Sequence, residues 1–83
     1  MITDEQFEAG LERIENNEAF VLKHPVLGRI TLTRDGRWIQ MDLRDVGASF
    51  WCQYVDLTCD TLMLWMESDV IGAIGAKYLE VDE

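Results

Sequence analysis

The residues of this 83-residue chain with the most versatile chemistry are two cysteines and one histidine. Cys52 or Cys59 can act as a nucleophile only beside a general base and an oxyanion-stabilising site, so His24 would have to meet one of them in space. The six residues between the cysteines match no zinc or redox motif, and one histidine is too few for a transition-metal site. We interpret both cysteines as reduced thiols and His24 as a polar residue at a strand end. These residues predict no catalytic group, no metal and no cofactor.

Carboxylates are abundant, with 16 Asp and Glu against 7 Lys and Arg, but no pair of them is set apart for acid and base catalysis. Asp56, Asp60 and Asp69 lack the 12-residue spacing, the glycine and the closing glutamate of a calcium loop. The sequence also has no GxGxxG, P-loop, GxSxG or HExxH motif. We therefore expect a protein that is not an enzyme.

The charge is strongly unbalanced, with a formal net charge of -9. Direct binding to nucleic acid is excluded as the expected function, because it requires a basic footprint. The net charge differs between segments: it is -5 for residues 1–18, +2 for residues 19–43 and -6 for residues 44–83. The acid is thus concentrated at the two ends of the chain, where we expect helices.

The first helix begins at a capping box, in which Thr3 and Gln6 each bond the backbone of the other. Its core face is marked by apolar residues spaced by four and three, and Asn16-Asn17 ends the pattern. The apolar residues are Phe7, Leu11 and Ile14.

Four glutamates form an acidic ridge beside that apolar face: Glu5, Glu8, Glu12 and Glu15. Their spacing of three, four and three places them within about 80° of arc on a helix, and only Arg13 is near enough to offset their charge. One interpretation is a solvated helix face. The other is that the ridge imitates a row of phosphates and docks on a basic groove built for nucleic acid. The remaining acids either extend such a face or are ordinary turn, cap and tail residues.

The rest of the chain predicts a sheet and a second helix. Two of the strands are joined by a hairpin turn at Arg34–Arg37, which contains Asp-Gly. Residues 44–49 are expected to form a loop, with a short helical turn as the alternative. The last helix is capped by Ser68 and gathers Val70, Ile71, Ile74 and Tyr78 on one side. The predicted strands are Glu18–His24, Arg29–Thr33, Trp38–Leu43, Phe50–Val55 and Thr61–Met66.

The sequence therefore predicts one α+β domain over residues 1–83, an antiparallel four- or five-stranded sheet with an N-terminal and a C-terminal helix. No stretch of about 18 apolar residues is present and the first ten residues are acidic, which predicts neither a membrane helix nor a secretory signal. We expect a cytoplasmic protein.

Three tryptophans are candidates for core or interface positions: Trp38, Trp51 and Trp65. Tryptophan often anchors interfaces, because its large rigid surface is ordered at small entropic cost. Trp65 lies between methionines in a run that is apolar on both faces, so it can belong to the core or to an adaptable contact patch. Together with Asp69 and the ridge it completes the expected partner-binding set.

In size, acidity and lack of a catalytic motif, the chain resembles the small anti-CRISPR and DNA-mimic inhibitors that phages and mobile elements encode. The resemblance rests on the acidic ridge and the overall charge, and it covers composition, since no family motif matches. It implies a basic protein partner, such as a CRISPR effector whose positively charged nucleic-acid channel the inhibitor occupies.

Two other functions remain open. One is an immunity protein or antitoxin that neutralises a basic nuclease toxin by electrostatic complementarity. The other is a structural or interaction module that forms a homodimer through Trp65, Met66 and the Gly72–Gly75 face. Identification of the partner separates the first from an anti-CRISPR, and the oligomeric state tests the second.

Overall fold

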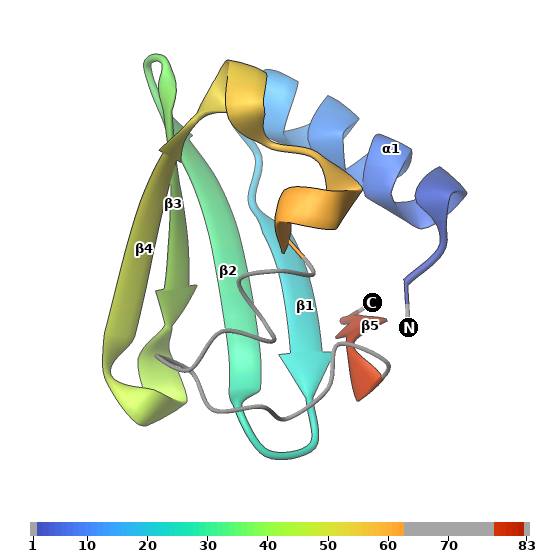
Figure 1. Cartoon of the computed structure of the whole chain (residues 1–83), viewed down its shortest axis with the longest axis vertical. Coiled ribbons are helices and arrows are strands. Elements are labelled where there is room, and N and C mark those ends of the chain that lie inside the picture. The colour runs from blue at the N-terminus through green and yellow to red at the C-terminus, as the bar shows by residue number, and fades with distance from the viewer. Residues whose placement is uncertain (1, 63–77, 83) are drawn as a thin grey trace.

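The computed structural model describes residues 2–62 and 78–82. In these ranges the chain has the predicted α+β fold, with one N-terminal helix, a five-stranded antiparallel sheet and short helical segments after the third and fourth strands (Figure 1). The elements are α1 (Asp4–Glu15), β1 (Phe20–His24), β2 (Gly28–Asp35), β3 (Trp38–Leu43), η1 (Arg44–Val46), β4 (Ala48–Gln53), η2 (Tyr54–Asp56) and β5 (Glu80–Val81).

Helix α1 begins at the predicted capping box. Thr3 Oγ1 accepts a hydrogen bond from the Gln6 amide at 3.1 Å, and the Thr3 amide donates to Gln6 Oε1 at 2.9 Å. These bonds satisfy backbone N–H groups that have no partner inside the helix. The helix ends at Asn16, and Asn17 adopts a left-handed φ of 60°, as its side-chain type allows.

The helix packs closely on β1 through a glycine. Phe7 and Ile14 are buried, Leu11 is half-buried, and Gly10 between them faces the ring of Phe20. A Cβ on Gly10 would lie 2.3 Å from that ring, so only glycine allows this approach. The apolar face predicted from the spacing is thus confirmed, with Gly10 as its closest contact.

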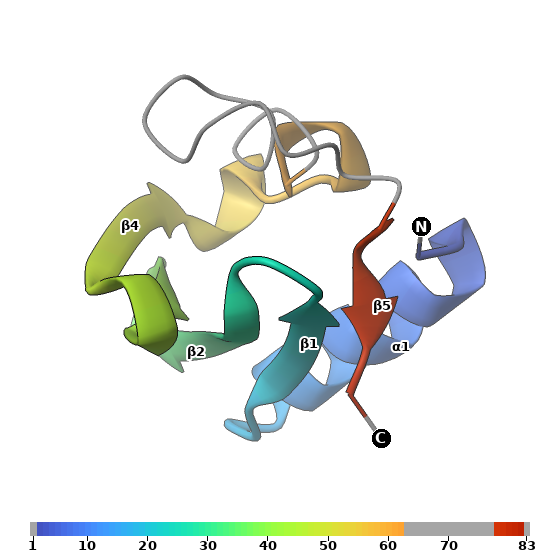
Figure 2. The ribbon, with the colours of Figure 1, turned by 90° about the horizontal axis from the view of Figure 1, so that it is seen from below.

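Strands β1 to β4 follow one another as hairpins, and β5 pairs with β1, which gives the order β4-β3-β2-β1-β5. β2 and β3 turn through Gly36 and Arg37, since Asp35 pairs with Trp38. Of these two turn residues only Gly36, at 61°, has a positive φ, the pattern of a type II′ turn. The turn therefore lies where it was predicted, with Asp35 as the last strand residue. Figure 2 shows the curved sheet with β4 and β5 at its two ends.

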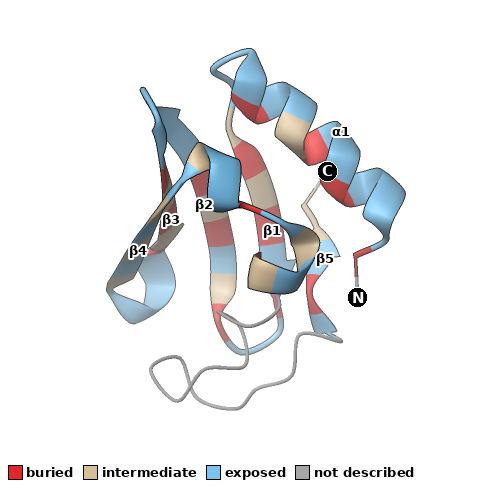
Figure 3. Ribbon diagram, turned by 45° about the horizontal axis from the view of Figure 1, so that its top comes forward, coloured by how far each residue is buried: buried red, intermediate tan, exposed pale blue. Residues whose placement is uncertain are grey.

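The sheet has an inner face that forms the core and an outer face that α1 leaves uncovered. Side chains alternate between them, as the burial colours in Figure 3 show. The inner face includes Leu22, Ile30, Leu32, Ile39 and Met41, all fully buried. The outer face carries Trp38 and Trp51, which are 42% and 51% exposed.

The strand predicted at Phe50–Val55 is present but shifted toward the N-terminus. η1 and Gly47, which has a left-handed φ of 71°, turn the chain early enough for β4 to begin at Ala48. The strand ends at Gln53 because Tyr54 enters η2. The alternative of a short helical turn within residues 44–49 is the one observed.

The strand predicted at Thr61–Met66 is wrong at its first two residues, since residues 59–62 are helical. Thr58 begins this helical turn: its Oγ1 accepts from the Thr61 amide at 3.1 Å, and its carbonyl accepts from the Leu62 amide at 3.0 Å. The remainder of that strand lies outside the described residues, as does the predicted last helix except for Tyr78. The sheet instead gains β5, which pairs with β1 through Leu22–Val81 and Lys23–Glu80.

Candidate protein-binding surface

All four glutamates of the acidic ridge are exposed on one side of α1. A shallow hollow over this side is lined by Glu8, Glu12 and Glu15 around the apolar side chain of Leu11. Among the described residues the ion pairs are Arg13–Glu18 and Arg29–Asp82, and neither involves the ridge. Within this described part of the chain, the ridge glutamates therefore have no ion-pair partner.

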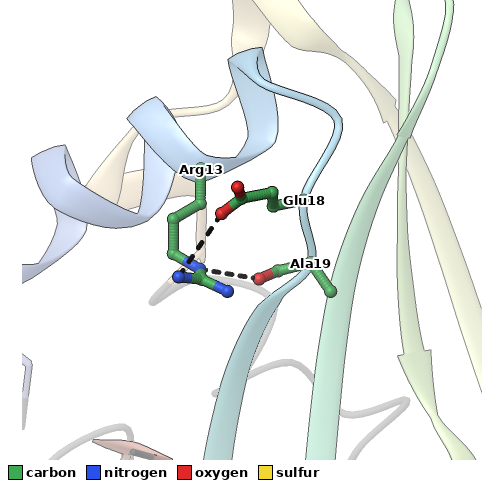
Figure 4. A network of polar contacts seen from close by, with 3 residues as sticks. All are labelled: Arg13, Glu18 and Ala19. Atoms are coloured by element: carbon green, nitrogen blue, oxygen red, sulfur yellow. Dashed lines mark hydrogen bonds and ion pairs between the residues drawn. The ribbon is translucent and has the colours of Figure 1, made fainter.

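Arg13, the one basic residue of α1, points toward Glu18 and Ala19 (Figure 4). Its Nε donates to the carbonyl oxygen of Ala19 at 3.0 Å, and its Nη1 lies 3.5 Å from Glu18 Oε2. Both partners come from the segment that leads into β1. The guanidinium thus joins the helix to the start of β1. Arg13 pairs with Glu18 and not with a glutamate of the ridge.

The C-terminal end of the ridge is held by Tyr54 of η2. The Tyr54 hydroxyl donates to Glu15 Oε1, and this hydrogen bond is the main cause that raises the pKa of Tyr54. The Arg34 guanidinium lies 4.5 Å from the centroid of the Tyr54 ring, a cation–π contact that brings a positive charge to this end. Glu15 is therefore a structural member of the ridge, and Glu5, Glu8 and Glu12 are its unpartnered members within the described chain.

The segment from η2 to the helical turn at 59–62 lies along the same flank of α1. Tyr54 meets Glu15 at one end, and Cys59 lies beside the carboxylate of Asp4 at the other. Asp56 and Asp60 of this segment are exposed. The anionic surface is therefore larger than the ridge, and we define it by its exposed acids: Asp4, Glu5, Glu8, Glu12, Asp56 and Asp60.

Two members of the expected partner-binding set, Trp65 and Asp69, lie outside the described residues. Asp56 and Asp60 were left open by the sequence, as either an extension of the acidic face or turn residues. The capping contact from Thr58 to Thr61 was the signal that residues 59–62 would form a helical turn and not begin a strand.

The cysteines and His24 occupy structural positions. Burial, followed by the charge of Asp56, raises the pKa of Cys52. Burial, followed by the charges of Asp4 and Asp60, raises the pKa of Cys59. A raised pKa lowers the thiolate fraction and hence the reactivity of each thiol.

His24 is buried, at 4% exposure, and its Nδ1 is used by the backbone. That nitrogen accepts from the amides of Val26 at 3.1 Å and Leu27 at 3.2 Å. His24 therefore organises the turn between β1 and β2, a more buried role than the polar strand end that the sequence predicted.

A second hollow of about 440 Å³ lies between α1 and the β1–β5 edge, lined in part by Gly10, Phe20 and Val81. Its charged groups are Arg13 and Asp82, one of each sign, so it does not extend the anionic surface. No cluster of three metal-ligating side chains occurs within residues 2–62 and 78–82, and no helix there has the length and apolar character needed to cross a bilayer. Comparison of the chain with protein-family models, curated proteins and solved structures finds no match.

Proposed function

We propose that this protein is an inhibitor that binds, through its anionic surface, the positively charged nucleic-acid-binding surface of a protein partner. The observation that supports this most is the state of Glu5, Glu8 and Glu12. They are exposed on one side of α1, they make no ion pair within the described residues, and the helix's own Arg13 is engaged elsewhere. Carboxylates at this spacing match a basic groove that normally receives phosphates.

The partner class follows from the charge. A cationic channel attracts a surface of this kind over the Debye length, about 8 Å at physiological salt and about 30 Å at 0.01 M. The resemblance to anti-CRISPR inhibitors favours a CRISPR effector as this partner, and a nuclease toxin is the alternative that the same surface would fit. We place the interaction in the cytoplasm, the host cytoplasm if the chain is phage-encoded.

The test begins with capture of partners from the native host on the immobilised protein, followed by mass spectrometry. A captured basic protein is then assayed for nucleic-acid binding with and without this chain. The proposal expects competition between the chain and nucleic acid for one site. A captured partner that binds nucleic acid and this chain at the same time would contradict it.

The ridge itself is tested by replacing Glu5, Glu8 and Glu12 with Lys. Glu15 is kept, because it holds Tyr54. A matched variant reverses three acids away from the ridge, Asp35, Asp42 and Glu80, and so changes the net charge equally. The ridge variant should lose at least about ten-fold in affinity, whereas the matched variant should lose much less. Equal losses would mean that net charge, and not this surface, is recognised.

A further inference from the structure

Strand β4 forms an edge of the sheet, and the direction of its backbone groups follows from its pairing with β3. The Tyr54 amide donates to the Arg37 carbonyl at 2.6 Å, one step beyond the Trp38–Gln53 pair in the same register. Because residues of an antiparallel ladder alternate in direction, the residues at 48, 50 and 52 bond β3. Ser49, Trp51 and Gln53 therefore direct their N–H and C=O groups away from the sheet.

These outward groups have no partner among the described residues, and all three residues are exposed. Soluble proteins usually protect such an edge with charged side chains, proline or a bulge. The sequence of β4, ASFWCQ, has no charged residue and no proline, although 28% of the whole chain is charged. At the other end of the sheet, β5 pairs with β1, and Arg13 bonds the Ala19 carbonyl just before β1. Within residues 2–62 and 78–82, the outward backbone groups of β4 are thus neither paired nor protected by a charged residue or a proline.

Two tryptophans lie beside this edge on the outer face of the sheet. Trp51 is 51% exposed and stands opposite Gln40, and Trp38 is 42% exposed and stands opposite Gln53. This register makes the two indoles diagonal neighbours, at a spacing of about 7 to 8 Å that aromatic side chains can bridge. Half-exposed tryptophans beside unpaired backbone groups are suited to an interface.

We propose that a second copy of this chain pairs antiparallel with β4 and extends the sheet across a two-fold axis at Trp51. Ser49 and Gln53 lie equally far from Trp51 on its two sides. A register that places Trp51 opposite Trp51 of the second copy therefore pairs Ser49 with Gln53 and satisfies all the outward groups of both strands at once.

The charge of β4 favours a second copy as the occupant. Each chain carries a net charge of -9, yet two β4 strands meet without bringing any like charges directly together. The pairing matches tryptophan with tryptophan and polar side chain with polar side chain, so the strand is complementary to itself. Because β4 carries no charge, it has no electrostatic attraction that would favour a charged strand from another protein. Since α1 packs against β1 and β2, such a dimer leaves the acidic ridges of both copies exposed.

Sedimentation velocity over a range of protein concentrations tests this interface. The wild type should approach twice the 9.6 kDa mass of one chain as concentration rises. Gln53→Pro should weaken the dimer at least about ten-fold, because it deletes an outward N–H from both strands. The Gln53 φ of -74° already fits proline, so the fold should persist, and circular dichroism checks this. Gln53→Ala keeps the N–H and is the matched control.

A second pair of variants tests the tryptophans. Trp51→Lys sets two positive charges opposite each other across the axis and should weaken the dimer at least as much as Gln53→Pro. Thr33→Lys places the same charge on the outer face of β2, away from the edge, and should have little effect. Higher salt should strengthen the dimer, because it screens the repulsion between two acidic chains, whereas it should weaken capture of a basic partner. The two proposals can therefore fail separately.

A wild type that stays monomeric throughout the accessible concentration range would overturn this inference. A dimer that Gln53→Pro and Trp51→Lys leave unchanged would overturn it too, since the contact would then lie elsewhere. Slow amide exchange at Ser49, Trp51 and Gln53 that appears only at high protein concentration would support it.

Discussion

The Tyr54 hydroxyl donates a hydrogen bond to Glu15 Oε1, a contact between residues 39 positions apart in the chain. It joins the last turn of α1 to the segment that follows β4, with Arg34 stacked on the same ring. The Glu15 carboxylate, at this end of the ridge, is therefore already hydrogen-bonded to Tyr54 within the protein. The ridge has a structural end at Glu15 and an available part at Glu5, Glu8 and Glu12.

The tyrosine titration should report this contact. In a Tyr78→Phe background, the remaining tyrosine should ionise at higher pH than it does when Glu15→Gln is added, because the Glu15 carboxylate favours the neutral phenol. Ultraviolet absorbance of the phenolate, followed against pH, measures the tyrosine ionisation in both variants. Ionisation at the same pH in the two proteins would show that the bond does not persist in solution.

The same contact has a pH-dependent effect on stability. Since folding raises the pKa of Tyr54, its stabilising contribution is complete below the ordinary tyrosine pKa of about 10 and is lost as pH rises through the folded value. Tyr54→Phe should lower the free energy of unfolding by less than about 1 kcal/mol at pH 7, since the contact is exposed, and the difference should vanish at alkaline pH. Urea denaturation at several pH values measures it.

Gly10→Ala should destabilise the protein even though alanine is the better helix former by about 1 kcal/mol. The added Cβ would lie 2.3 Å from the buried Phe20 ring. Overpacking of this kind usually costs about 1 to 3 kcal/mol. In a Phe20→Leu background the same substitution should cost clearly less, and a double-mutant cycle by urea denaturation measures the coupling. Equal costs in both backgrounds would mean that Phe20 is not the obstacle.

The capping box should contribute about 1 kcal/mol to the free energy of unfolding. Thr3→Ala removes the Oγ1 acceptor of the Gln6 amide and should lower stability by that amount, whereas Thr3→Asp keeps an acceptor and should retain most of it. Thermal denaturation of the three proteins compares them. If Thr3→Asp lowered the stability as much as Thr3→Ala does, the Oγ1 acceptor would not be the cause of the destabilisation.

His24→Leu should lower the free energy of unfolding by about 1 to 3 kcal/mol. The substitution fills the buried position with an apolar side chain but leaves the amides of Val26 and Leu27 without their acceptor. Lys23→Ala, at the exposed neighbouring position, is the control and should change stability little. Urea denaturation measures both, and an unchanged His24→Leu protein would contradict the role of Nδ1.

Elements specified by local signals could be predicted from the sequence. The capping box fixed the start of α1, and alternating polarity with a glycine turn identified the β2–β3 hairpin. β5 could not be predicted in this way, because a strand of two residues is too short to show an alternation of polar and apolar side chains. It forms only because its backbone pairs with β1. At residues 59–62, an apolar run was interpreted as a strand although Thr58 provides a helix cap.

The ridge could be predicted because helix periodicity places its glutamates on one side. The direction of Arg13 could not, since it depends on Glu18 and Ala19 beyond the helix end. The role of Glu15 and the approach of Tyr54 and Cys59 to α1 depend on tertiary contacts between distant segments.

The association rate of the captured partner, measured as a function of salt, tests the central claim most directly. For the wild type the rate should fall at least about ten-fold between 0.01 M and 0.15 M salt, because screening shortens the reach of the exposed carboxylates. The variant with Glu5, Glu8 and Glu12 changed to Lys should associate slowly at both salt concentrations, with the fold verified by circular dichroism. A folded ridge variant that associates as fast as the wild type, with the same salt dependence, would contradict the claim.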